Sequence, residues 1–146
     1  MFALTIGVAF LVCGATIPVS AQKNGKTPDA GRPKFTVKAQ PAYGVSPAHI
    51  TLTAELVGGA DDFEEYYCPT VRWEWDDGTS SESTLDCAPF EAGKTEIKRK
   101  FLIEHTFKQA GAFKVYVRLK QKNKVVARGS TDVKVRPGVR DPGIDR

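Results

Sequence analysis

The sequence contains no segment in which apolar residues recur with the i, i+3, i+4 spacing of a long amphipathic helix. Because a surface helix needs such an apolar stripe to pack against a core, this absence excludes a helical bundle. Excess charge of one sign is also scarce: 21 Lys and Arg oppose 17 Asp and Glu, which leaves a net charge of +4. The cations are spread along the chain, so we expect no nucleic-acid partner.

Motifs for catalysis and metal binding are missing as well. No Gly-x-Ser-x-Gly nucleophile elbow is present, and neither His49 nor His105 lies beside an evident catalytic partner. No Cys-x-x-Cys pair or EF-hand spacing marks a zinc or calcium site. We therefore expect a protein that is not an enzyme and has no cofactor or metal. One alternative stays open, which is a Ca²⁺ site. Carboxylate oxygens are hard ligands for this ion, and four carboxylates would supply them if they lie at the same end of the fold: Asp61, Asp62, Asp76 and Asp77.

The first 21 residues carry no charged side chain, and Lys23 is the first cation. Pro18 precedes Val19-Ser20-Ala21, whose small last and third-last residues suit a signal peptidase. We interpret residues 1–21 as a cleaved export signal, which predicts a secreted, periplasmic or cell-surface protein without stable membrane insertion. The usual basic amino-terminal region is missing, so a retained membrane anchor is the alternative. A lipid anchor at Cys13 is disfavoured, because Val12 stands where a small residue is needed.

Cleavage after residue 21 would leave two cysteines, Cys68 and Cys87. An even pair in an exported protein is most simply a disulfide. Residues 22–34 are rich in Lys, Gly, Pro and Asn without periodic apolar positions, so they predict a flexible leader. Residues 137–146 contain Pro and Gly and predict a flexible tail.

The centre of the chain reads Val-Arg-Trp-Glu-Trp-Asp-Asp-Gly-Thr from residue 71 to 79. Alternation places Val71, Trp73 and Trp75 on one face of a strand and the polar residues between them on the other. Asp77-Gly78 then predicts a tight turn, because Gly tolerates positive φ.

Similar alternation recurs elsewhere, with short apolar and polar repeats separated by Gly, Pro or polar turns. Strands are predicted for residues 35–39, 50–57, 97–107, 113–119 and 125–135, and a short edge strand or an exposed loop is predicted for residues 79–84. Gly129 predicts a β-bulge. About seven such strands, each with one apolar face, predict an all-β, two-sheet sandwich spanning residues 35–136 as a single domain.

Two motifs resemble those of a known family. Trp73-Glu74-Trp75-Asp76-Asp77-Gly78-Thr79 resembles the Trp-Asp-Phe-Gly-Asp-Gly signature of the PKD (polycystic kidney disease) domain family, with Glu74 and Asp76 as departures. His105-Thr106-Phe107 followed by Gly111-Ala112-Phe113-Lys114-Val115 resembles its His-Thr-Tyr and Gly-x-Tyr-x-Val signature.

The resemblance implies an immunoglobulin-like antiparallel β-sandwich found in extracellular proteins as an accessory or spacer module, without catalytic residues. It also implies structural roles for a set of signature residues in the core, the turn and the corner: Trp73, Trp75, Gly78, His105, Phe107, Gly111 and Phe113.

The acidic and aromatic connection before the tryptophan strand lies outside the family pattern. With the adjacent turn it forms our predicted binding site, comprising Asp61, Asp62, Glu64, Glu65, Tyr66, Tyr67, Asp76 and Asp77. Exposed tyrosines provide contact area at little entropic cost. The alternative, which we favour for Tyr66 and Tyr67, is that one packs beneath the loop and the other is a lone surface aromatic. We expect an exported, non-catalytic module that binds a protein or carbohydrate, or alternatively an accessory subunit or spacer of a polysaccharide-active or adhesion assembly.

A basic stripe is a further possibility. It would combine cations of residues 98–100 with those of the strand at 113–119 and the turn after it, and would attract an acidic polysaccharide. The more ordinary interpretation, which we favour, is that these charges keep the outer face of a sheet soluble.

Overall fold

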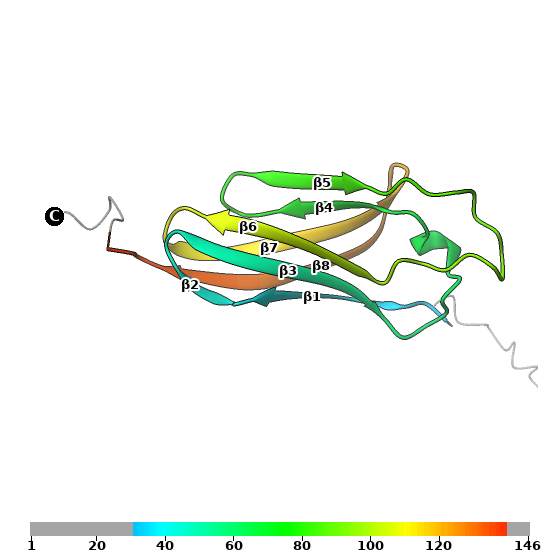
Figure 1. The fold of residues 1–146 in the computed structure, drawn as a ribbon, viewed down its shortest axis with the longest axis horizontal. Helices are drawn as coiled ribbons and strands as arrows, with labels where there is room; N and C mark the ends of the chain where they lie inside the picture. Colours follow the sequence, from blue (N-terminus) through cyan, green and yellow to red (C-terminus); the bar gives the residue numbers. More distant parts are fainter. Residues whose placement is uncertain (1–30, 140–146) are drawn as a thin grey trace, which may run out of the picture.

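The computed structural model describes residues 31–139, so the predicted export signal and most of the predicted leader and tail lie outside the described residues. The described chain forms eight strands and one short 3₁₀ helix (Figure 1). These are β1 (Lys34–Gln40), β2 (Tyr43–Val45), β3 (Ala48–Val57), η1 (Glu64–Tyr66), β4 (Thr70–Glu74), β5 (Ser80–Thr84), β6 (Lys100–Phe107), β7 (Gly111–Gln121) and β8 (Lys124–Arg136). In this part of the chain no helix is long and apolar enough to cross a membrane.

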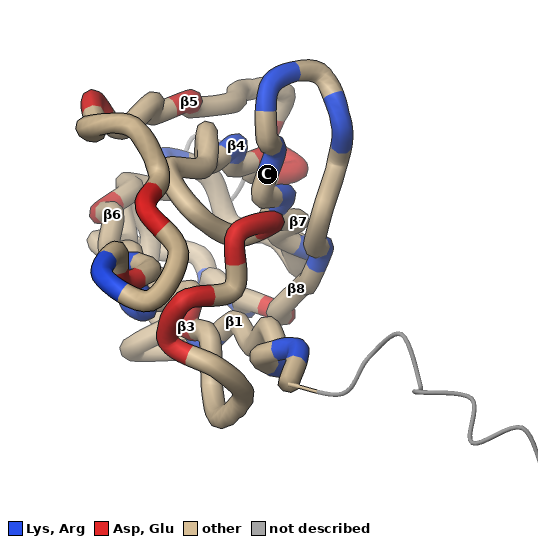
Figure 2. Tube along the Cα trace, turned by 90° about the vertical axis from the view of Figure 1, so that its right-hand side faces the viewer, with Lys and Arg blue, Asp and Glu red and all other residues tan. Residues whose placement is uncertain are grey.

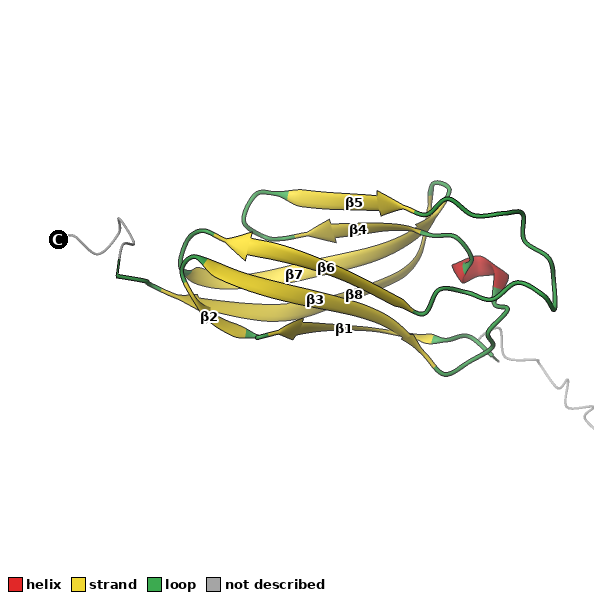
Figure 3. Cartoon of the chain, in the orientation of Figure 1, coloured by secondary structure: helices red, strands yellow, loops and turns green. Residues whose placement is uncertain are grey.

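The strands form two sheets that pack face to face, which confirms the predicted all-β sandwich (Figure 3). One sheet has the order β1-β3-β6, and the other has the order β2-β8-β7-β4-β5. Neighbours are antiparallel except β2 and β8, which are parallel. The count exceeds the expected seven because β2 is only three residues long, too short to show alternation. Residues 80–84 form the edge strand β5.

Strand β4 buries the face that its sequence predicts. Val71, Trp73 and Trp75 are each at most 2% exposed, and the two indole rings stack with centroids 6.1 Å apart. A buried Trp side chain removes about 150–250 Å² from water, worth roughly 4–6 kcal/mol before the entropy of ordering it. The remaining core comes from the inward residues of both sheets: Ile50, Leu52, Ala54, Leu56, Phe101, Phe107, Val115, Val117, Leu119, Val133 and Val135.

The expected bulge at Gly129 is wrong. Gly129 pairs regularly with Val117, and the register shift lies instead where Leu119 pairs with Ala127 and Lys120 with Val125. Gly129 is required for packing, because a Cβ there would lie 2.8 Å from Cγ2 of Val37. The glycine lets β1 of one sheet approach β8 of the other.

The folded domain begins before the predicted boundary at residue 35. Lys34 already belongs to β1, and Pro33 is buried. The Arg32 guanidinium donates to the Val126 carbonyl at 2.6 Å and to the Tyr66 hydroxyl at 2.8 Å. Residues 31–34 are therefore part of the fold, because these contacts tie them to the core.

The predicted disulfide between Cys68 and Cys87 is confirmed. It links the segment before β4 to the long connection of residues 85–99 that leads from β5 to β6. Tyr67 reinforces the link, since its ring packs on Phe90 with centroids 5.4 Å apart and its hydroxyl donates to the Ala88 carbonyl. The connection is thereby fixed to one end of the sandwich.

Candidate functional site

The predicted binding residues divide between opposite ends of the sandwich. Asp61 to Tyr67 precede β4, whereas Asp76 and Asp77 follow it, so the length of the strand separates the two groups. In Figure 1, η1 marks one end and the turn between β4 and β5 marks the other. The four carboxylates considered for Ca²⁺ therefore do not converge. Within residues 31–139 no group of three or more His, Cys, Asp or Glu is placed to hold a metal ion.

At the η1 end, two of the four predicted acidic residues are engaged in ion pairs that hold the loop to the fold. Figure 2 views this end directly and shows acidic segments beside basic ones. Asp61 accepts from Arg99 at 2.5 Å, and Glu65 accepts from Lys124 at 2.8 Å and pairs with Arg32 at 3.1 Å. The Lys124 hydrogen bond lowers the pKa of Glu65, although partial burial opposes this.

The tyrosines at this end are not the exposed pair that a contact surface needs. Tyr66 is only 2% exposed, because its ring packs against Phe63 with centroids 5.1 Å apart. Tyr67 is half-buried against Phe90. Of the predicted binding residues at this end, only Asp62 and Glu64 have exposed carboxylates without a partner among the described residues. Sequence adjacency could not distinguish these environments.

At the other end, the turn from Asp76 to Thr79 is held by its own side chains. Asp76 has φ 62° and Gly78 has φ 85°, the left-handed region that favours Gly and tolerates Asp. Asp76 accepts from the Lys114 amide at 2.9 Å, which ties the turn to β7. Oδ1 of Asp77 accepts from both the amide (3.0 Å) and the hydroxyl (2.5 Å) of Thr79.

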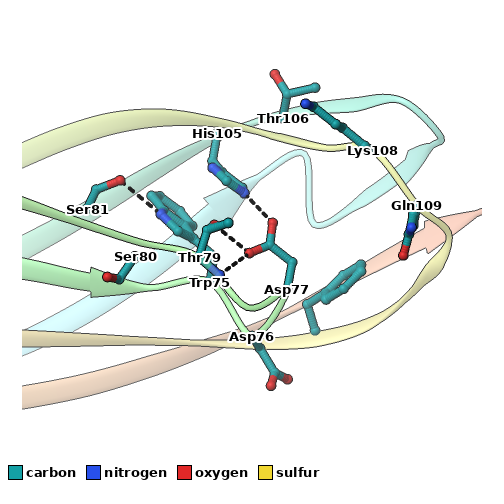
Figure 4. A pocket seen from close by; sticks show the side chains of 11 residues that line it. Trp75, Asp76, Asp77, Thr79, Ser80, Ser81, His105, Thr106, Lys108 and Gln109 are labelled. Atoms are coloured by element: carbon teal, nitrogen blue, oxygen red, sulfur yellow. Dashed lines mark hydrogen bonds and ion pairs between the residues drawn. The ribbon is translucent and has the colours of Figure 1, made fainter.

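His105 of β6 connects this turn to the second sheet. Its Nε2 lies 2.7 Å from Oδ2 of Asp77, and its ring stacks on Trp75 with centroids 4.1 Å apart (Figure 4). Burial raises the pKa of the Asp77 carboxyl, but the hydrogen bonds from Thr79 and His105 outweigh it, and the pKa lies below its ordinary value. The indole Nε1 of Trp75 donates to Ser81 at 3.0 Å. Trp75, Asp77 and His105 thus form one rigid unit.

The remaining signature residues extend this unit. Phe107 is fully buried and its ring stacks against half-buried Phe113 with centroids 4.6 Å apart. Gly111 is the first residue of β7, and a Cβ there would lie 3.0 Å from the Phe113 ring. These contacts join the corner before β7 to the core.

A pocket of about 700 Å³ opens above this rigid unit, between the β4–β5 and β6–β7 turns. Figure 4 shows the side chains that surround it. They are Trp75, Asp76, Asp77, Thr79, Ser80, Ser81, His105, Thr106, Lys108, Gln109 and Phe113. We call this region the pocket end.

The polar groups of the pocket end fall into two classes. Both carboxylate oxygens of Asp77 are occupied by hydrogen bonds within the turn and to His105. The side chains of Ser80, Lys108 and Gln109 have no partner among the described residues and are exposed. Free donors and acceptors thus surround a fixed floor, an arrangement suited to holding a polar ligand. Sequence reasoning missed Lys108 and Gln109, because polar turn residues carry no pattern that distinguishes a pocket wall from ordinary solvent exposure.

The basic stripe considered from the sequence does not form. Lys100 is the first residue of β6, in the three-stranded sheet, and residues 98–99 precede it, while Lys114, Arg118 and Lys120 lie on β7 of the five-stranded sheet. Consecutive strands of a sandwich often belong to different sheets, so their charges face different directions.

Several solved structures are similar to this chain. One is the PKD domain of an M14-like peptidase from a Thermoplasmatales archaeon, at 16% identity and a TM-score of 0.49, covering 72% of this chain and 98% of that one. Another is a putative membrane-anchored protein from Corynebacterium diphtheriae, at 14% identity and a TM-score of 0.49, covering 69% of this chain and 20% of that one. A CARDB domain from Pyrococcus furiosus has 14% identity and a TM-score of 0.44, and the match covers 74% of this chain and 97% of that one.

The comparison with curated proteins found no match. The family model of the PKD domain matches residues 34–134, which include every strand from β1 to β7 and most of β8. The match contains both sequence signatures and the Trp75, Asp77 and His105 unit that they build. The chain therefore belongs to the PKD domain family.

Proposed function

We propose that this protein is an exported, non-catalytic module that binds a carbohydrate or protein partner through its pocket end. PKD domains are typically extracellular and form a family of non-catalytic modules. The disulfide between Cys68 and Cys87 supports export, because disulfides persist in oxidising compartments. The uncharged first 21 residues support it too.

The choice of this site rests on one observation. The pocket end contains a pocket of about 700 Å³ whose floor is rigid and whose walls carry polar side chains without a partner among the described residues. Ligand sites in proteins enclose roughly 300–1,000 Å³ and combine fixed geometry with a few convergent polar groups. Because Trp75, Asp77 and His105 are held by their mutual contacts, a ligand would meet a preformed surface and lose little free energy to ordering it. At the η1 end, by contrast, Asp61 and Glu65 are paired and Tyr66 is buried, so these predicted binding residues are not free to meet a ligand.

The free polar side chains of the pocket end favour a partner rich in hydroxyl or carbonyl groups. These side chains are Ser80, Lys108 and Gln109. Lys108 supplies three donors, Gln109 supplies both donors and acceptors, and Ser80 supplies a hydroxyl. The Asp77 and His105 pair holds the turn against β6 in this proposal and takes no part in bond breaking. A saccharide or a polar peptide loop satisfies this set of groups equally.

The test compares two double variants of the purified protein. Lys108→Ala/Gln109→Ala removes free side chains of the pocket end, and Asp62→Ala/Glu64→Ala removes free side chains of the η1 end. Binding to an oligosaccharide panel and capture of partners from a cell-surface fraction are measured for each. We expect the first variant to lose binding by about tenfold and the second to retain it.

Two results would contradict the proposal. Loss in the η1 variant alone would move the site to the loop of residues 61–67. Wild-type protein that captures no saccharide and no protein would favour the spacer role instead. Circular dichroism of both variants checks that the fold is retained, which is expected because the substituted side chains are exposed and have no partner among the described residues.

A further inference from the structure

Three arginines lie in a row on the outer face of the five-stranded sheet. In the strand register, Arg72 of β4 pairs with Arg118 of β7, and Arg118 pairs with Arg128 of β8. Their neighbours along each strand, such as Trp73 and Val117, point into the core, so the arginines face outward. Adjacent strands are about 4.8 Å apart, which places three guanidinium groups within a short distance of each other. Like charges directly opposite one another destabilise a sheet.

Two carboxylates offset only part of this repulsion. Glu74 accepts from Arg118 at 2.8 Å and from Arg72 at 3.3 Å, and Glu82 pairs with Arg72 at 3.6 Å and with Lys120 at 3.1 Å. Three cations, Arg72, Arg118 and Lys120, therefore share two carboxylates. Arg128 has no hydrogen bond or ion pair within the described chain and is exposed, so the β8 end of the row is left with uncompensated positive charge.

The surface is hollowed beside this unpaired arginine. A depression of about 330 Å³ is lined by Tyr116, Val117, Arg118, Arg128, Gly129 and Ser130. Tyr116 is 44% exposed, and it pairs in register with Ser130 in the row next to Arg118 and Arg128. An aromatic ring, a hydroxyl and two guanidinium groups therefore surround one small hollow.

We propose that this surface, which we call the arginine face, binds a polysaccharide that contains uronic acid. A sugar carboxylate would lie between Arg118 and Arg128, because the guanidinium fork matches a carboxylate with two parallel hydrogen bonds. The exposed ring of Tyr116 would pack against the sugar ring, and Ser130 would hydrogen-bond a hydroxyl. The arginine row crosses β4, β7 and β8, so an extended polymer lying across these strands would follow it. This site is separate from the pocket end and does not depend on the function proposed for it.

A matched pair of polymers tests the ligand chemistry. Polygalacturonate carries a carboxylate on each ring, whereas its fully methyl-esterified form has the same backbone without the charge. We expect the wild-type protein to bind the first and to bind the second at least about tenfold more weakly. Binding should weaken further as salt is raised, because Arg128 is exposed and Arg118 is only half-buried, so salt screens both charges. Equal binding of both polymers would overturn the proposal.

Three single variants test the location. Arg128→Gln removes the unpaired cation, Tyr116→Ala removes the exposed ring, and Lys38→Gln makes the same change of charge on the outer face of the other sheet. We expect Arg128→Gln to weaken polygalacturonate binding about tenfold and Tyr116→Ala to weaken it severalfold. Lys38→Gln should bind as wild type. An equal loss in Lys38→Gln, or none in Arg128→Gln, would exclude the arginine face.

Other polyanions provide the remaining control. Poly-glutamate and single-stranded DNA should compete poorly at matched charge concentration, because neither presents a sugar carboxylate beside a ring surface. Competition as effective as that of polygalacturonate, together with unchanged binding by Tyr116→Ala, would show a non-specific basic surface and contradict the proposal. The Lys108→Ala/Gln109→Ala variant should bind polygalacturonate normally, which separates this result from the pocket end.

Discussion

His105 lies flat on Trp75, with ring centroids 4.1 Å apart and planes within 6° of parallel. The two residues come from different sheets, β6 and the end of β4, so the stack joins the halves of the sandwich at the pocket end. The face of His105 that meets Trp75 is shielded from water, while its Nε2 is directed to Asp77. One histidine therefore fixes both the core and the turn.

Removal of the Asp77 carboxylate should destabilise the protein. Asp77→Ala eliminates the hydrogen bonds to Thr79 and His105, and the side chain is only 20% exposed. We expect the free energy of unfolding to fall by about 1–3 kcal/mol. Urea denaturation measures it, with Asp62→Ala as the exposed control that should change little. If Asp77→Ala lowers the free energy of unfolding no more than Asp62→Ala does, the hydrogen bonds of Asp77 are no stronger than those that its carboxylate makes with water in the unfolded protein.

Stability should decline in acid because of the same residue. The pKa of Asp77 is lowered in the folded protein, since the hydrogen bonds from Thr79 and His105 outweigh the effect of burial. The unfolded state therefore binds protons more readily, and the stabilisation is present above the ordinary pKa of 3.8 and lost as pH falls through the lower folded pKa. The lowered pKa of Glu65 acts in the same direction.

Denaturation at about pH 5 and about pH 3 measures this dependence. Asp77→Asn should lose less stability between the two conditions than wild type, because the substituted amide does not titrate there. A variant with the same acid sensitivity as wild type would assign the effect to other carboxylates.

Loss of the disulfide should lower stability by about 3 kcal/mol. Cys68 and Cys87 are 19 residues apart, and a crosslink that closes such a loop restricts the unfolded chain by this amount. Cys68→Ala/Cys87→Ala should therefore unfold at a lower urea concentration. Wild-type protein with a reductant should shift to the same midpoint. Thiol titration of the unfolded, unreduced protein should detect neither cysteine, and reaction of both would contradict the pairing.

Gly129→Ala should be destabilising although alanine is small. The added methyl group would lie 2.8 Å from Cγ2 of Val37 and 3.3 Å from the ring of Phe35. Overpacking of this kind costs about 1–3 kcal/mol. In a Val37→Ala background the cost should shrink, because the closest contact is removed. Additive effects of the two substitutions in thermal denaturation would show that the contact between β1 and β8 is not the cause.

Much of the fold follows from local patterns. Alternation in residues 71–75 and 113–119 predicts which side chains are buried, because every second residue of a strand faces the same side. The β4–β5 turn also follows from a local pattern. Asp77-Gly78 predicts a tight turn, and Gly78 adopts the positive φ that such a turn needs. The disulfide follows from the number of cysteines that remain once the predicted export signal, which contains Cys13, is set aside.

The positions of the sites do not follow from such patterns. Asp61 and Asp77 are close in sequence and lie at opposite ends of the sandwich, because β4 runs between them. Lys108 joins Asp77 at the pocket end only through the adjacent turns of two sheets. Arg72 and Arg128 are far apart in sequence and share a row only because β7 pairs with both β4 and β8.

The sequence by itself determined the strands, their buried faces, the tight turn and the crosslink, because each depends on the conformational preferences and burial of neighbouring residues. The tertiary structure alone decided the order of strands in each sheet and their register. Those two properties arise from long-range backbone pairing, and they place the pocket end and the arginine face where residues from distant segments meet.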